Sequence, residues 1–150
     1  MKSRLLSDID GQRTFALVFD SGDEVTEGLR AFAIEHRLTA ASFTAIGAFE
    51  RATLGYFDVR TRNYARIALD EQVEVLALGG NVALAGDEPK VHAHVVVGKS
   101  DGTAHGGHLL DALVRPTLEV TLVESPAHLR RTIDPATGLP LLNLDASDRT

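Results

Sequence analysis

The chain has 150 residues, 44% of them apolar, which is enough to bury the core of one domain and excludes a disordered chain. Its formal net charge of −6 opposes binding to nucleic acid and to anionic membranes. Cysteine is absent, which excludes disulfides and leaves His, Asp and Glu as the side chains available for a metal.

The amino-terminal segment predicts neither a secretion signal nor a membrane anchor. Residues 1–11 are too polar for a signal peptide, and no apolar run in the chain approaches the length of a membrane span. We therefore expect a cytoplasmic protein in which residues 1–11 are a lead-in to the first strand.

The first quarter of the chain predicts one strand and one amphipathic helix. Residues 14–20 form the strand, and Ser21-Gly22-Asp23 breaks it and offers N-caps for the helix. The helix is expected over about residues 23–36, with a buried stripe of apolar side chains at helical spacing, namely Val25, Leu29, Phe32 and Ala33. His36 lies at its end, where a cation near the helix C-terminus explains it better than a catalytic role.

The rest of the chain predicts strands and turns. Strands are expected at residues 40–48, 51–59, 62–69, 71–84, 91–98, 103–108 and 116–124, with a break at Gly79-Gly80 and a hairpin formed by 51–59 and 62–69. Residues 109–114 predict a short helical or irregular piece. Pro116 can begin a strand or lie on an edge, but not in a central ladder.

These elements predict an α+β fold with a mostly antiparallel sheet of about seven strands and one main helix. The whole chain, residues 1–150, is expected to form one domain, with about 125–150 as a C-terminal extension docking on it. One helix cannot cover both faces of so large a sheet. The uncovered apolar face is therefore expected to fold on itself or to meet another subunit.

Four of the six histidines fall within residues 91–110, VHAHVVVGKSDGTAHGGHLL. Because a strand alternates, His92 and His94 leave the same face. A three-residue loop with Gly102 in the left-handed conformation pairs Lys99 with Thr103 and sets His94 opposite His108. His105 then points to the other face, although the two glycines before His108 can bulge or end the strand.

Three imidazoles on one patch predict a metal site at His92, His94 and His108. Three protein ligands leave a fourth position open, and zinc or another divalent transition metal is the expected occupant. Unrelated polar residues on a wet sheet face are the alternative, because two histidines spaced two apart on a strand are common by chance.

The same stretch resembles a known family. The pattern V-H-A-H-V-x-x-G-x-x-D-G-x-x-x-G-G-H-L, followed by V-x-P-T-L-E-V at residues 114–120, is similar to the PPC (plants and prokaryotes conserved) domain. Further matches lie upstream at residues 43–48, 54–58 and 74–81. The resemblance implies a stand-alone prokaryotic-type member, a homotrimer, and a metal site like that of metal-containing members with the same histidine pattern.

Glu119 occupies the position of the family's characteristic acid in T-L-E-V. It could orient a ligand histidine, act as a fourth ligand or serve as a base on metal-bound water, and an exposed strand carboxylate is an equal alternative. The leading function is metal-dependent binding of a small ligand or partner. A metal-dependent hydrolase of unknown substrate is a further alternative, and enzyme activity is left open because no established catalytic motif is present.

A DNA-associated regulatory role is the runner-up, because the family is often described as DNA-binding. Plant members join this domain to a separate AT-hook that touches DNA, and this chain has no Arg-Gly-Arg-Pro hook. Four arginines, Arg51, Arg60, Arg62 and Arg66, make the predicted hairpin basic, but a solvated surface explains them better. We therefore expect DNA binding to be disfavoured by the net charge.

Overall fold

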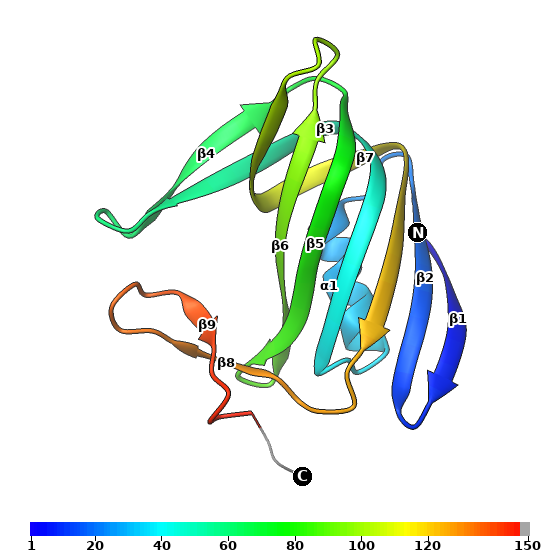
Figure 1. Cartoon of the computed structure of the whole chain (residues 1–150), viewed down its shortest axis with the longest axis vertical. Coiled ribbons are helices and arrows are strands. Elements are labelled where there is room, and N and C mark those ends of the chain that lie inside the picture. Colours follow the sequence, from blue (N-terminus) through cyan, green and yellow to red (C-terminus); the bar gives the residue numbers. More distant parts are fainter. Residues whose placement is uncertain (148–150) are drawn as a thin grey trace.

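The computed structural model describes residues 1–147, in which one helix packs against a single nine-stranded sheet (Figure 1). The elements are β1 (Lys2–Ile9), β2 (Gln12–Asp20), α1 (Val25–Glu35), β3 (Ala40–Asp58), β4 (Asn63–Leu69), β5 (Val73–Ala85), β6 (Glu88–Gly98), β7 (Ala104–Glu124), β8 (Arg130–Ile133) and β9 (Pro140–Leu142). Every strand pair is antiparallel except β5 with β8. The predicted α+β class is confirmed, with nine strands instead of about seven.

The additional strands lie at the two ends of the chain. Residues 2–9, expected as a lead-in, form the edge strand β1 and pair with β2. All of β1 except Ser7 is exposed, so no buried pattern in the sequence marks it as a strand. It is held by backbone pairing, which any sequence can supply. The tail contributes β8 and β9, in which Arg131 is the one buried residue.

Two long strands replace shorter predicted ones. The strands predicted at 40–48 and 51–59 are one strand, β3, which ends at Asp58, and residues 104–124 are one strand, β7. The prediction of an irregular piece at 109–114 is wrong, because that segment pairs with β3 and buries Leu109, Ala112 and Val114. Pro116 lies within β7 instead of beginning a strand, at a register shift that leaves it without a ladder partner.

Helix α1 covers one face of the sheet, and in Figure 1 the helix lies behind the strands. Its buried residues are the predicted stripe, Val25, Leu29, Phe32 and Ala33. The N-cap is Glu24, one residue beyond the predicted candidates, and its carboxylate accepts a hydrogen bond from the Glu27 backbone N–H at 2.6 Å. His36 is the C-cap, where its ring packs 4.1 Å from that of Phe32.

The strands around the histidines close on one another. β6 pairs with β5 on one side and with the first part of β7 on the other, while β3 pairs with both β5 and β7. The face toward α1 carries the core, with Phe19, Phe43 and Leu122 among its largest side chains. Among residues 1–147, no helix is long and apolar enough to cross a membrane.

The tail returns to the sheet after β7. Leu84 and Ala85 at the end of β5 pair with Arg130 and Arg131 of β8, and β9 then pairs back onto β8. Arg131 of β8 and residues 139–141 of the tail lie close to β6, the strand that carries His92 and His94, because they line one cavity with residues 90–92.

Candidate metal centre

The hairpin between β6 and β7 has the predicted geometry. The Lys99 backbone N–H donates to the Thr103 carbonyl at 2.9 Å, and Gly102 adopts a φ of 83°. Its positive φ is the left-handed conformation that a three-residue loop requires and that glycine adopts without strain. The register that follows pairs His94 with His108 and Val97 with His105.

The three predicted histidines come together. His92 and His94 alternate along β6 with the buried Ala93 and Val95, so both rings leave the face away from the core. The three ring centroids lie 5.0–5.4 Å apart, and one ligand nitrogen from each ring lies within 4.8 Å of the other two. Within residues 1–147, this is the one cluster of three or more such side chains.

The cluster fits a zinc-type ion. Zn–N bonds of about 2.0–2.1 Å at tetrahedral angles separate ligand nitrogens by roughly 3.4 Å, so modest ring rotations suffice here. The His108 Nδ1 atom is buried and has no hydrogen-bond partner among residues 1–147, and an unpaired buried nitrogen is costly unless something binds it. His94 is exposed, which leaves the cluster open on one side.

Burial and neighbouring positive charge keep two of the rings neutral. Burial is the main cause that lowers the pKa of His108 to about 4, with smaller effects from His92, His94 and Lys90. Burial and then Arg131 lower the pKa of His92. Neutral imidazole is the form that binds a metal, so these rings are prepared for coordination at pH 7.

Glycines let the backbones around the cluster approach closely. A Cβ on Gly107 would meet the Gly55 carbonyl oxygen at 2.8 Å, and a Cβ on Gly80 would meet the His92 carbonyl oxygen at 2.4 Å. The strands continue through both glycine pairs without a register shift there. The predicted break at Gly79-Gly80 is therefore wrong, because β5 runs through both residues, and Gly80 serves close packing.

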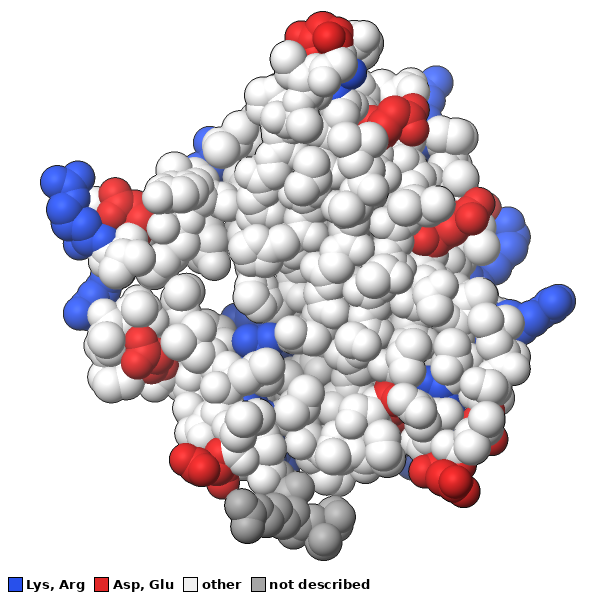
Figure 2. Space-filling view, viewed as in Figure 1, with Lys and Arg blue, Asp and Glu red and all other residues white. Residues whose placement is uncertain are grey.

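A cavity of about 150 Å³ adjoins the cluster, with His92 and His108 in its wall. Its other lining residues come from β4, β6 and the tail, namely Tyr64, Lys90, Val91, Arg131, Leu139, Pro140 and Leu141. Figure 2 shows basic atoms deep in a hollow on this face of the molecule. Sequence reasoning missed Arg131, because no motif distinguishes it from its neighbour Arg130 in an otherwise turn-rich tail.

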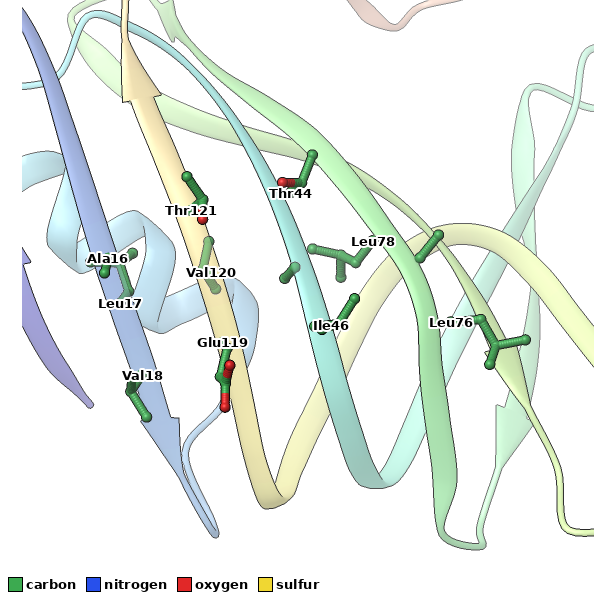
Figure 3. A pocket seen from close by; sticks show the side chains of 12 residues that line it. Ala16, Leu17, Val18, Thr44, Ile46, Leu76, Leu78, Glu119, Val120 and Thr121 are labelled. Atoms are coloured by element: carbon green, nitrogen blue, oxygen red, sulfur yellow. The ribbon is translucent and has the colours of Figure 1, made fainter. Parts of the chain in front are cut away.

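Two other candidates lie apart from the cluster. His105 shares a face with the buried Val97, as expected, and is not among the clustered rings. Glu119 pairs with Ile46 of β3 and Val18 of β2, so β3 and β5 lie between it and the β6 histidines. Its side chain lines a shallow hollow of about 530 Å³ on the outer sheet face (Figure 3).

The chain is similar in sequence and in fold to known proteins of one family. The model of the Plants and Prokaryotes Conserved (PCC) domain matches residues 7–126. A metal-containing protein from Archaeoglobus fulgidus is 37% identical, with a TM-score of 0.81 over 87% of this chain and 92% of that one. A Bacteroides thetaiotaomicron protein, for which DNA binding is proposed, is 28% identical with a TM-score of 0.84 over 93% and 96%.

A curated relative carries a similar segment within a much longer protein. The bifunctional protein GlmU of a Synechococcus strain is 33% identical over 136 residues, which is 89% of this chain but only 21% of that protein. The family match, in contrast, covers most of the chain and includes β6, β7 and all three clustered histidines. The chain therefore belongs to the Plants and Prokaryotes Conserved (PCC) domain family.

Proposed function

We propose that this chain is a metal-binding protein that holds zinc through His92, His94 and His108 and binds a small ligand at the open position. One observation carries the proposal, which is the convergence of three imidazole ligand atoms within 4.8 Å of one another. The partnerless Nδ1 of His108 supports it, as does the likeness to a metal-containing protein. Zinc would supply a Lewis acid with a free coordination position.

Metal analysis of the purified, untagged protein tests this function. We expect about one zinc ion per chain after exposure to zinc followed by desalting. A protein that holds no stoichiometric metal, and binds none on addition of zinc, cobalt or nickel, would contradict the proposal.

The lowered pKa values of His108 and His92 should make zinc affinity less dependent on pH than it is for three free imidazoles. Protons compete with zinc for imidazole nitrogens below the free histidine pKa of about 6.5, and three free imidazoles would give a slope approaching three decades of affinity per pH unit. The pKa of His108 is about 4, so this ring loses no proton on binding at pH 5.5, and the lowered pKa of His92 reduces the number of protons that its ring releases. We expect zinc affinity to fall with falling pH with a slope well under three.

A chelator competition titration at pH 7.0, 6.0 and 5.0 measures this slope. Affinity that falls by three decades per unit between pH 6.0 and 5.0 would show that the pKa of His108 is not lowered as the structure indicates.

We also propose that the chain forms a homotrimer through the sheet face opposite α1. That face exposes Ile46 at 61% and Leu76 at 56%, together with Val18 and Val96. Exposed apolar side chains gathered on one face are typical of surfaces that meet another subunit. Glu119 lies among them, so we propose that any contact of this carboxylate with a metal centre is made across the subunit interface.

DNA binding is the second candidate, favoured by the proposed role of the Bacteroides thetaiotaomicron protein. Its basis in this chain is weak. Arg66 of the β3–β4 hairpin is paired with Asp111 at 2.9 Å, which reduces the positive charge that the hairpin presents. The net charge of −6 further opposes approach to a polyanion.

We expect generic duplex DNA to bind with a dissociation constant weaker than roughly 10⁻⁴ M at physiological salt. Fluorescence anisotropy with a labelled duplex, at several salt concentrations, measures it. Micromolar binding that weakens steeply with salt, and that disappears when Arg60, Arg62 and Arg66 are replaced by Ala, would reverse the order of the two candidates.

A further inference from the structure

We propose that the cavity beside the histidine cluster is a binding site for a small organic carboxylate, which Arg131 holds through its guanidinium group. The inference deepens the proposed function by naming the class of ligand. It rests on that function only where the carboxylate also contacts the metal, because the Arg131 site is formed by the chain itself.

The charges around the cavity favour an anion. Two cationic side chains, Lys90 and Arg131, line it, and within residues 1–147 no Asp or Glu is among its lining residues. This is unusual in a chain in which acidic residues outnumber basic ones by 21 to 15. A divalent ion at His92 and His108, in the same wall, would add further positive charge.

Arg131 is buried without a carboxylate partner. Its side chain belongs to a residue only 8% exposed, and within residues 1–147 no acidic group forms an ion pair with it. Its Nη1 donates to the Pro140 carbonyl at 3.0 Å and its Nη2 donates to Asn81 Oδ1, so both partners are neutral. The Nε atom is buried and has no hydrogen-bond partner in the described part of the chain.

A buried guanidinium that keeps an unpaired N–H is costly for the fold, because removal from water is not compensated. Two neutral acceptors hold the group in place and leave Nε for another molecule. A planar guanidinium matches a carboxylate better than an ammonium group does, since it can donate two parallel hydrogen bonds.

The size and walls of the cavity restrict the ligand further. A volume of about 150 Å³ is below the range of drug-sized sites and suits roughly five to ten non-hydrogen atoms. Val91, Leu139 and Leu141 make part of the wall apolar, and the Tyr64 ring packs against His108 at 5.1 Å. A carboxylate with a short apolar body can satisfy both the arginine and these walls, whereas inorganic phosphate leaves the apolar wall uncovered.

Binding of propionate to the full chain tests the site, with propionamide as its uncharged analogue and inorganic phosphate as a second anion. Ligand-observed NMR titrations on zinc-loaded and on metal-free protein give the dissociation constants. For wild type we expect propionate to bind on the order of 1 mM, as a ligand of few atoms allows. Propionamide and phosphate should bind at least tenfold more weakly.

Arg131→Met should weaken propionate binding at least tenfold and leave the zinc stoichiometry unchanged. Arg130→Met is the matched control, because it removes the same charge from the neighbouring residue, which lies outside the cavity lining. It should change the dissociation constant less than twofold. Arg131→Lys keeps the charge without the planar fork and should bind propionate with intermediate strength, which decides the matter if Arg131→Met does not fold.

The outcomes separate this inference from the proposed function. If propionate binds wild type and Arg131→Met equally, the carboxylate assignment to Arg131 is overturned while the zinc site stands. The assignment also fails if propionamide or phosphate binds as well as propionate. If zinc does not bind but propionate still depends on Arg131 in metal-free protein, the proposed function fails and the carboxylate site remains.

Discussion

Replacing His92, His94 or His108 by Ala, one at a time, is expected to remove most of the zinc from the protein. Each ring supplies one of three ligands, and the three ligand atoms lie within 4.8 Å of one another. Loss of an outer partner of a metal ligand already costs roughly 10–100-fold in affinity, so loss of a ligand should weaken binding by more than about 100-fold. Zinc content after desalting, with a chelator titration for the affinity, measures the effect.

His105→Ala is the best control, because His105 lies on the same hairpin but shares its face with Val97. It should keep its zinc, and His36→Ala and His128→Ala should do so as well. The ring of His36 packs on Phe15 and Phe32, so that variant is expected to lose stability but not metal. A His108→Ala protein that retains full zinc would show that the cluster is not the metal site.

Ile46→Asp is expected to convert the proposed homotrimer into monomers. Ile46 is 61% exposed in the single chain and lies at the centre of the outer sheet face, beside the hollow shown in Figure 3. An aspartate there would be buried without a partner in the trimer but would stay in water in the monomer. Light scattering should give about three times the 16.1 kDa chain mass for wild type, and about one chain mass for the variant.

Val59→Asp is the matched control for the assembly. Val59 is 67% exposed, but it follows β3 at the hairpin turn and lies outside the hollow. Its variant should keep the mass of wild type. Wild-type protein that is a stable monomer or dimer at micromolar concentration would exclude the trimer. An Ile46→Asp protein that remains trimeric would show that another surface forms the interface.

The histidine site could be predicted because its geometry is almost entirely local. Alternation along β6 places His92 and His94 on one face, and the Gly102 loop sets the pairing with His108. All three lie within one hairpin, so no long-range contact is needed to bring them together. The class of the fold was predictable for a similar reason, because the spacing of apolar residues along a short segment distinguishes a helix from a strand.

The elements that were missed depend on contacts between distant parts of the chain. Strand β1 buries almost nothing and is defined by its pairing with β2. The sequence of residues 109–114 has no regular pattern of its own. These residues continue β7 because β3 pairs with β7 along nearly its whole length. In the sequence, Gly80 predicts a break in the strand. In the structure, the Phe43 ring and the His92 carbonyl oxygen occupy the space that a Cβ at this position would need.

The sequence alone determined the family, the α+β class and the three histidines of the candidate metal site, because each follows from a pattern of nearby residues. Only the tertiary structure decided what surrounds that site. β8 returns to β5 in parallel register from more than 40 residues away and brings Arg131 to Asn81 and to the cavity beside His92. Glu119, in contrast, is separated from the β6 histidines by two strands. No local pattern records such distances, because they arise from the pairing of whole strands and from the side chains buried between them.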